Sequence, residues 1–279
     1  MDALKNLIMA MYDAACGDKL IEDTADILSI SDCRTSIGGA FSGFIDGGAK
    51  LAYTSLTSVA LSLIVMYFLF SITDKVAQGQ MTIEIFVPEF IKLLAAAFLV
   101  LEGYNFFKLL ISLGESITKK VGNSFTNDPT TNNLRYMVET NADDSAIVQV
   151  SVLAVLIIPT IFGLLARLSI YVVCIGRALE IIVRLALSPI AVADVFGNGL
   201  NSGGFRYIKK FLAVTLQGAV IIVIIHIMGT LNATLAIPPD NDTSVSALFG
   251  NLMKVVFVNL AGVSLIIKSQ SIVNDVVGA

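Results

Sequence analysis

Three long apolar runs constrain the fold of this chain more than any other sequence feature. They cover residues 51–73, 145–166 and 211–239, and none of them contains Asp, Glu, Lys or Arg. A helix needs about 20 consecutive, mostly apolar residues to cross the roughly 30 Å hydrocarbon core of a bilayer. Each run is long enough, so each predicts a membrane-spanning helix.

The composition agrees with this interpretation. Of 279 residues, 56% are hydrophobic and only 14% are charged, and the mean hydropathy is +0.82. A soluble domain has about a quarter of its residues charged. We therefore predict an all-α protein, a polytopic bundle of five or six transmembrane helices. A net charge of −4 gives no bulk attraction for nucleic acid.

The predicted organisation has three parts. Residues 1–50 form a polar and amphipathic region, in which Leu4, Leu7, Ile8 and Met11 recur at helical spacing. Residues 51–268 form the transmembrane domain, and residues 269–279 form a short polar tail. Between the second and third spans, residues 114–144 have the composition of a loop that either carries an amphipathic helix or lacks structure. The predicted spans are residues 51–72, 85–111, 147–176, 178–195, 211–231 and 247–267.

The segment 178–195 decides the topology. Pro189 has no backbone N–H to donate to Leu185, so we predict a helix that is bent or interrupted there. If this segment crosses, six spans place both termini in the cytoplasm by the positive-inside rule. If it does not cross, five spans place the termini on opposite sides. The C-terminus is cytoplasmic in both cases, and the side of the N-terminus stays open.

Charged residues inside the apolar segments are the candidate functional residues. A charge at membrane depth costs roughly 2.5–3.5 kcal/mol on insertion scales, so it usually faces protein or water. On a helix, Arg177, Glu180 and Arg184 share one face, with the two arginines about 20° apart. The set forms ion pairs that make burial possible, provides a surface for neighbouring subunits, or lines a water-filled interior.

Other intramembrane polar residues have similar alternatives. Glu102 is either a paired carboxylate or a group for proton relay or ion coordination, and Arg167 lies near an interface or an aqueous interior. His226, the single histidine, either hydrogen-bonds its surroundings or shuttles protons. After the glycine-rich run at 197–204, a basic turn on the cytoplasmic side is predicted from Arg206, Lys209 and Lys210.

The sequence carries no recognisable catalytic motif. One histidine and three scattered cysteines have no zinc or haem spacing, and no nucleotide-binding or hydrolase motif is present. We therefore expect no enzyme activity, no catalytic residues, no cofactor and no metal. Cys174 is interpreted as a small apolar side chain, and whether Cys16 and Cys33 pair stays open.

The order of these features resembles the TrbL-like inner-membrane subunits of type IV secretion and conjugation systems, particularly those of Gram-positive bacteria. The resemblance rests on residues 82–117, 177–194 and 205–221, and its most specific element is the Ser-Pro-Ile-Ala sequence at 188–191 before a basic, aromatic helix start.

This resemblance implies a multi-pass subunit of the bacterial cytoplasmic (inner) membrane. Such a subunit contacts membrane lipids, forms a homo-oligomer and joins other secretion subunits, including separate ATPases. DNA or protein substrate passes through the platform only transiently.

The alternative hypothesis is a small secondary transporter or channel. It would use Glu102, Glu180 and His226 as coupling residues, in helices interrupted at Pro159 and Pro189. No inverted repeat relates the two halves of the sequence.

Overall fold

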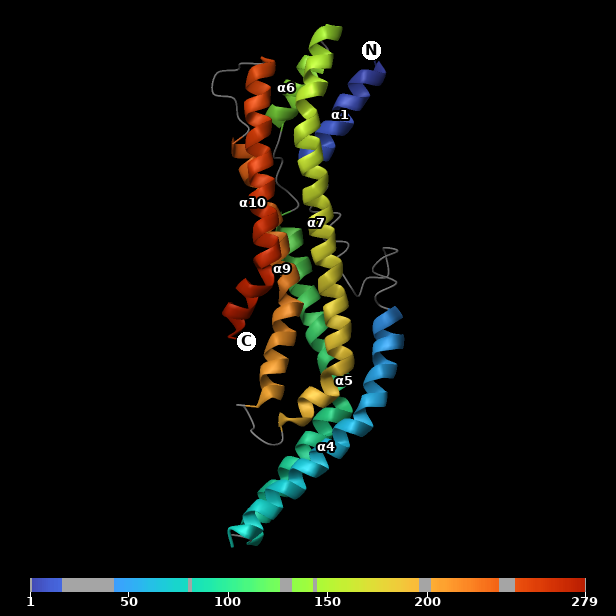
Figure 1. Ribbon diagram of the computed structural model, residues 1–279, viewed down its shortest axis with the longest axis vertical. Coiled ribbons are helices and arrows are strands. Elements are labelled where there is room, and N and C mark those ends of the chain that lie inside the picture. The colour runs from blue at the N-terminus through green and yellow to red at the C-terminus, as the bar shows by residue number, and fades with distance from the viewer. Residues whose placement is uncertain are drawn as a thin grey trace. The chain divides into compact units, whose positions relative to one another are not determined.

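The computed structural model describes residues 2–16, 43–79, 82–125, 132–142, 145–195, 202–235 and 244–278. Within these ranges the elements are helices joined by turns, without a strand, which confirms the all-α prediction (Figure 1). The elements are α1 (Asp2–Cys16), the π-helix η1 (Ile45–Ala49), α4 (Lys50–Ala77), α5 (Ile83–Phe125), α6 (Asn132–Ala142), α7 (Ala146–Ala193), α9 (Gly203–Leu235) and α10 (Val245–Val277).

Four helical stretches in the described chain are long and apolar enough to cross a membrane. They are Ile45–Ala77, Ala146–Ala193, Gly203–Asn232 and Val245–Val277, as expected of a multi-pass membrane protein. The predicted span 85–111 lies inside α5 but is not among the four. A count of five or six spans therefore stays a prediction.

The interruption predicted at Pro189 is not present. Segments 147–176 and 178–195 are one helix, α7, which continues past Pro159 and Pro189 to Ala193. A side chain explains this continuity: the Ser188 hydroxyl donates to the Leu185 carbonyl at 2.8 Å. That carbonyl is the group that Pro189 leaves without its usual N–H donor, and serine hydroxyls can satisfy such groups inside membrane helices. A bend at Pro189 stays a prediction.

Residues 114–144, which the sequence left open between a loop and an amphipathic helix, are largely helical where described. The helix α5 runs on to Phe125, and α6 occupies Asn132–Ala142. Residues 126–131 and 143–144 lie outside the described residues.

The chain divides into two compact units. Unit 1 comprises residues 1–27, 118–175 and 219–269, and unit 2 comprises residues 28–117, 176–218 and 270–279. The helices α5, α7, α9 and α10 contribute residues to both units. Each unit has its own apolar core.

In unit 1, the short helices α1 and α6 pack with the first turns of α7 and α10. The buried face of α1 is formed by Ile8, Tyr12 and Ala15, whereas Leu7 is exposed. The sequence pattern had placed Leu7 on the apolar face. The shared core contains Ile8, Tyr12, Leu134, Met137, Val138, Ala142, Val152, Leu156, Leu248, Leu252 and Val255.

A glycine allows α1 to lie directly against α7 in unit 1. A Cβ at Gly163 would be only 2.6 Å from the Ala14 carbonyl oxygen and 2.7 Å from the Ala15 Cα. One turn earlier, the Thr160 hydroxyl donates to the Met11 carbonyl at 3.1 Å. This contact is therefore between backbones, and a side chain at position 163 would separate them.

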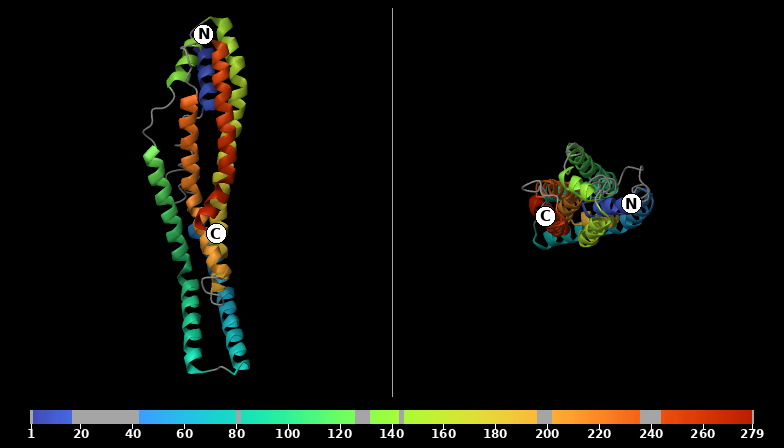
Figure 2. Two further views of the ribbon diagram at one scale, coloured as in Figure 1. Left: turned by 90° about the vertical axis from the view of Figure 1, so that its left-hand side faces the viewer. Right: turned by 90° about the horizontal axis from the view of Figure 1, so that it is seen from above.

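In unit 2, α4 and the first part of α5 form a helical hairpin, coloured cyan to teal in Figure 2. Phe68 of α4 packs edge-on against Phe86 and Phe90 of α5, with ring centroids 6.3 and 6.4 Å apart. Further along, the Tyr53 hydroxyl donates to the Val100 carbonyl at 2.6 Å. Gly103 leaves room for that tyrosine.

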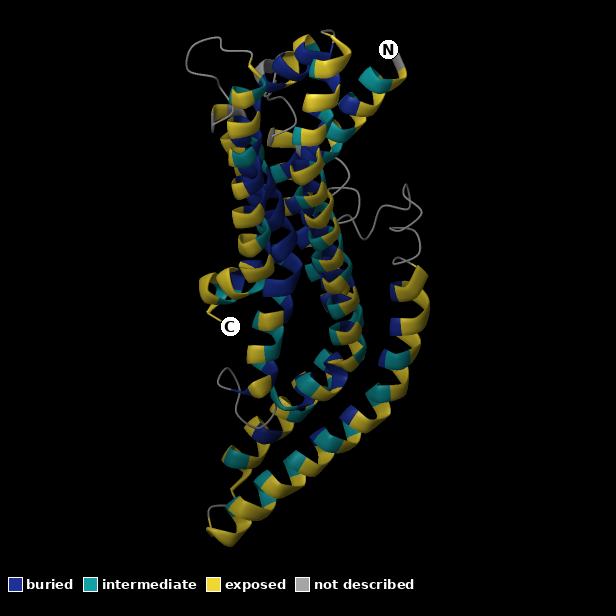
Figure 3. Ribbon diagram, turned by 45° about the horizontal axis from the view of Figure 1, so that its top comes forward, coloured by how far each residue is buried: buried dark blue, intermediate teal, exposed yellow. Residues whose placement is uncertain are grey.

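Burial differs strongly among the helices. In the most apolar window of Gly203–Asn232, 67% of residues are buried, against 11% for Ile45–Ala77. Figure 3 shows this contrast as dark blue along α9 and yellow over much of α4. Long exposed apolar surfaces on a protein usually contact lipid or another protein. The helix α9 is thus an interior element, and α4 presents its apolar side chains outward.

Candidate functional site

Arg177 is the most buried charged residue of the predicted stripe, with 3% of its surface exposed. Its Nε donates to the Val214 carbonyl at 3.0 Å, and its Nη2 donates to the Thr215 carbonyl at 2.9 Å. A helix carbonyl has two lone pairs, so it can accept these bonds in addition to its own helical bond. Arg177 therefore joins α7 to α9 inside unit 2.

Gly218 makes this arrangement possible. A Cβ at Gly218 would lie 2.8 Å from Nη1, 2.9 Å from Cζ and 3.0 Å from Nη2 of Arg177. The guanidinium group therefore occupies the space that any other residue at position 218 would need. Because position 218 is glycine, the planar guanidinium of Arg177, which stays charged, can lie directly against the backbone of α9.

Glu180 and Arg184 form a second polar group in unit 2. Arg184 donates through Nε to Glu180 Oε1 at 2.8 Å and also pairs with it through Nη2 at 2.5 Å. Gln270 of α10 donates through Nε2 to both carboxylate oxygens, at 2.9 and 3.1 Å. The hydroxyl of Tyr207 on α9 donates to the Arg184 carbonyl.

These two groups together form what we call the unit 2 polar cluster: Arg177, Glu180, Arg184, Tyr207, Gly218 and Gln270. It connects α7, α9 and the end of α10. The side chains of Arg184 and Glu180 are 23% and 29% exposed, so this ion pair is only partly buried. The sequence predicted the shared helix face, and the structure adds the partners on the other two helices.

The remaining predicted residues do not join this cluster through their described contacts. Glu102 is exposed and accepts a hydrogen bond from Asn105 at 2.9 Å on its own helix. Arg167, in unit 1, donates to the Asp13 carbonyl of α1 at 2.6 Å. His226, also in unit 1, has the Thr230 hydroxyl 3.5 Å from its Nε2. Pro189 is buried within α7.

The residues predicted as a basic turn belong instead to a helix start, the element that the resemblance places after the Ser-Pro-Ile-Ala sequence. Arg206, Lys209 and Lys210 lie in the first turns of α9, which begins at Gly203, so they are helical residues. Asp194 accepts a hydrogen bond from the Gly203 N–H at 2.8 Å, which satisfies one of the N–H groups at this helix start. Lys209 lies 5.5 Å from the ring centroid of Phe205, and the other two basic side chains are exposed.

Sequence reasoning missed a buried carboxylate in the α4–α5 hairpin. The side chain of Glu89 is 8% exposed and lies between Lys75, at 2.5 Å, and Lys92, at 2.9 Å. Ser71 also donates to it, at 3.3 Å. The i, i+3 spacing of Glu89 and Lys92 in the sequence could have indicated their ion pair. The contact with Lys75 could not be predicted in this way, because it depends on the packing of α4 against α5.

A second missed feature is an amide chain in unit 1. Asn232 of α9 donates to the Asn259 Oδ1 of α10 at 3.3 Å, and Asn259 donates to the Ala15 carbonyl of α1 at 3.2 Å. Both asparagines are buried. In apolar helices such amides hold neighbouring helices together. Their partners are far apart in sequence, so spacing alone could not indicate them.

Polar side chains of the described residues make hydrogen bonds and ion pairs within and between helices. Among them, no group of three or more His, Cys, Asp or Glu side chains is close enough to hold a metal ion. Cys174 is buried. Whether Cys16 and Cys33 pair lies outside the described residues.

Comparisons with protein-family models, with curated proteins and with solved structures gave no match for this chain.

Proposed function

We propose that this chain is a TrbL-like, multi-pass subunit of the inner-membrane platform of a bacterial type IV secretion or conjugation machine. It acts by oligomeric assembly, and it forms part of the path that DNA or protein substrate follows. Separate partner ATPases supply the energy. The observation that carries the proposal is the unit 2 polar cluster, in which the intramembrane charges of the resembling segment 177–194 act as connections between helices.

The cluster favours a structural role over a catalytic or coupling one. Arg177 is held by two backbone carbonyls, and the Glu180 carboxylate is shared between Arg184 and Gln270. Groups that take up and release ions or protons need access and a change of partners. Here the charges have partners on the neighbouring helices, as expected of a bundle that must keep its shape during assembly.

The unit 1 core supports a five-span topology. With α7 as one crossing, the crossings are α4, α5, α7, α9 and α10, so α1, α6 and the first turns of α7 and α10 lie on one side. With six crossings, α1 and α6 would lie opposite the start of α10. The core joins Ile8, Leu134 and Leu248 from these three helices, which supports five crossings over six. We propose that this side is the outer one and that the C-terminus is cytoplasmic.

Exposed apolar surface on unit 2 supports contact with lipids and with further subunits. Along α4 and α5, large side chains including Phe70, Phe98 and Leu109 are more than half exposed. A bilayer covers such a surface at no cost, and a second copy can cover part of it. We propose that the α4–α5 hairpin provides the face through which copies associate.

Gentle extraction tests the proposal, with a pair of variants that distinguishes assembly from overall charge. Glu180→Ala removes the carboxylate that Arg184 and Gln270 share, so we expect it to lower the yield of oligomer on native gels and in chemical cross-linking. Glu139→Ala removes an exposed carboxylate of α6 that pairs with Arg135 on the same helix, and we expect it to leave the yield unchanged.

Two results would count against the proposal. Equal oligomer yields from both variants would remove the assembly role of the cluster. A monodisperse monomer that binds no secretion protein would contradict the function as a whole. A neighbouring gene for a secretion ATPase or a coupling protein would support it strongly.

The transporter or channel hypothesis has less support than it had from the sequence. Its main feature was a helix interrupted at Pro159 and Pro189, and α7 is continuous through both. Of its three coupling residues, Glu102 and Glu180 belong to unit 2 and His226 to unit 1. Reconstituted ion flux that is lost when Glu180 and Arg184 are both changed to Leu would revive this hypothesis.

A further inference from the structure

Three basic residues lie in the first turns of α9, at one end of a helix that is otherwise free of charge. Arg206, Lys209 and Lys210 come directly before the apolar run 211–239, which contains no Asp, Glu, Lys or Arg. The stretch Gly203–Asn232 is long and apolar enough to cross a membrane. Where α9 crosses a bilayer, the apolar run fills the hydrocarbon core, so the residues directly before it lie at the membrane surface.

The end of α10 supports this position. The Lys209 ammonium group donates to the Gly278 carbonyl at 3.4 Å, so the first turns of α9 lie beside the end of α10. That end is polar, because residues 270–275 include Gln, Ser, Asn and Asp. Two neighbouring helices therefore become polar at the same level of unit 2, as expected where helices leave the hydrocarbon core.

Arg206 and Lys210 carry positive charge on an exposed helix face. Both residues are exposed, and the i, i+4 spacing places them on the same side of α9. In the part of the chain that the structure describes, neither forms an ion pair with an acidic side chain. Like charges at this spacing repel each other, and cations are unfavourable at the N-terminal end of a helix. An anion from outside the chain would relieve both effects.

A tyrosine between the two basic residues fixes the rotation of α9. The Tyr207 hydroxyl donates to the Arg184 carbonyl of α7, and its ring packs edge-on against Phe107 of α5, with centroids 6.4 Å apart. Tyr207 is thus directed toward the interior of unit 2. The two basic side chains that flank it are held on the exposed side of the helix, next to the start of the apolar run.

We propose that Arg206 and Lys210 bind the phosphate headgroup of an anionic phospholipid. A guanidinium group matches phosphate through a planar set of donors, and an ammonium group adds a point charge. A phospholipid carries its phosphate next to acyl chains, and these two residues lie next to apolar helix surface. A lipid therefore matches both features, whereas a nucleic acid or an acidic protein segment matches the charge alone. The site is independent of the proposed function, because it requires only that α9 crosses a bilayer.

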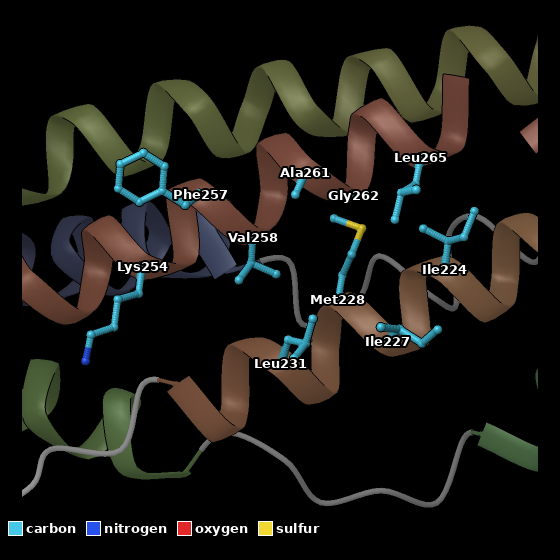
Figure 4. Close-up of a pocket in the computed structure, with 10 residues that line it drawn as sticks. All are labelled: Ile224, Ile227, Met228, Leu231, Lys254, Phe257, Val258, Ala261, Gly262 and Leu265. Atoms are coloured by element: carbon cyan, nitrogen blue, oxygen red, sulfur yellow. The ribbon is translucent and has the colours of Figure 1, made fainter. Parts of the chain in front are cut away.

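The chain contains no tryptophan, so one introduced tryptophan reports on lipid at a chosen position. Phe205→Trp places the reporter beside the basic residues. Ile227→Trp is the control on the same helix, at a position that is 49% exposed. It lies in the apolar groove between α9 and α10 of unit 1, apart from the groove's single charged residue, Lys254 (Figure 4). The variants are reconstituted in vesicles in which either phosphatidylglycerol or phosphatidylcholine carries bromine near the headgroup end of its acyl chains, at equal mole fractions.

We expect brominated phosphatidylglycerol to associate with the Phe205→Trp reporter about 25-fold more strongly than brominated phosphatidylcholine at low salt, from about fivefold for each basic residue. Arg206→Gln and Lys210→Gln should each lower this ratio about fivefold, and together they should bring it to about one. Lys92→Gln removes the same charge, but that ammonium group pairs with Glu89 at 2.9 Å, so the ratio should not change. The control reporter in the groove should show a ratio of about one.

Four results would overturn the proposal. Equal ratios at the two reporters would mean that the basic residues serve a water-soluble anion, such as an acidic protein segment or a nucleic acid. A ratio that persists in the double variant would exclude the two named side chains. An equal decrease from Lys92→Gln would assign the preference to net charge. The absence of quenching by either lipid at the Phe205→Trp reporter would mean that a protein covers this face. Circular dichroism checks that the variants stay helical, as expected for changes at exposed side chains.

Discussion

Replacing Gly218 with alanine tests the central contact of the unit 2 polar cluster. The new Cβ would lie 2.8–3.0 Å from three atoms of the Arg177 guanidinium. Non-bonded atoms of this kind are most stable at about 3.5–4.0 Å. The guanidinium must therefore move by more than half an ångström, and its hydrogen bonds to Val214 and Thr215, at 3.0 and 2.9 Å, cannot both survive.

The size of the effect follows from these two bonds. Hydrogen bonds of charged groups stabilise a protein by about 1.5–3 kcal/mol each, and interhelical bonds in membranes lie lower, at about 0.6–1.7 kcal/mol. Taking about 1.5 kcal/mol for each gives a loss of about 3 kcal/mol. Alanine is about 1 kcal/mol more favourable than glycine inside a helix. The net expectation is a decrease of about 2 kcal/mol in the free energy of unfolding.

Unfolding by SDS in mixed micelles, followed by circular dichroism, measures this quantity. Gly229→Ala is the matched control on the same helix, because a Cβ there would meet no atom within 4 Å. We expect this control to be neutral or slightly stabilising. In an Arg177→Met background, Gly218→Ala should no longer decrease the free energy of unfolding, because the guanidinium that the new Cβ displaces is absent. Equal stability of the two alanine variants in the unchanged background would refute the reasoning.

Two further contacts give predictions of the same kind. Glu89→Gln removes the carboxylate that pairs with Lys75, so we expect the α4–α5 hairpin to lose about 1–2 kcal/mol, measured as a lower midpoint of thermal unfolding. The exposed change Glu84→Gln should leave that midpoint in place, and a shift of equal size in both would contradict the ion-pair argument. Gly163→Ala should push α1 away from α7, since the new Cβ would lie 2.6 Å from a backbone oxygen, and should make α1 more susceptible to trypsin in limited proteolysis. Gly176→Ala, which meets nothing within 4 Å, is its control, and equal cleavage of the two would show that the close approach does not hold α1.

Much of the helical architecture was predictable from hydropathy. The predicted spans 51–72, 85–111, 211–231 and 247–267 each lie within one observed helix. The reason is that a chain crossing a bilayer must satisfy its backbone hydrogen bonds within the segment, which leaves helices as the solution for a chain of this pattern. Helix ends were less predictable, because polar residues such as those at 114–125 extend a helix as readily as they form a loop.

The continuity of α7 could not be predicted in this way. The rule that proline interrupts a helix assumes that the freed carbonyl stays without a donor, and here the Ser188 hydroxyl supplies one to Leu185. The rule therefore failed for a local reason that the neighbouring serine could have indicated. The residues predicted as a basic turn are helical for a similar local reason. The Asp194 carboxylate accepts a hydrogen bond from the Gly203 N–H, which satisfies one N–H group at the start of α9.

Helical periodicity alone established that Arg177, Glu180 and Arg184 share a face, because spacing along one helix fixes direction around its axis. It also established that these charges require partners, since apolar surroundings make isolated charge costly. Which partners they have depends on the packing of helices that are distant in sequence. The carbonyls of Val214 and Thr215 lie 37 and 38 residues away from Arg177 along the chain, and the amide of Gln270 lies 90 residues away from Glu180. Only the tertiary structure brings these groups, and the space at Gly218, to the charges.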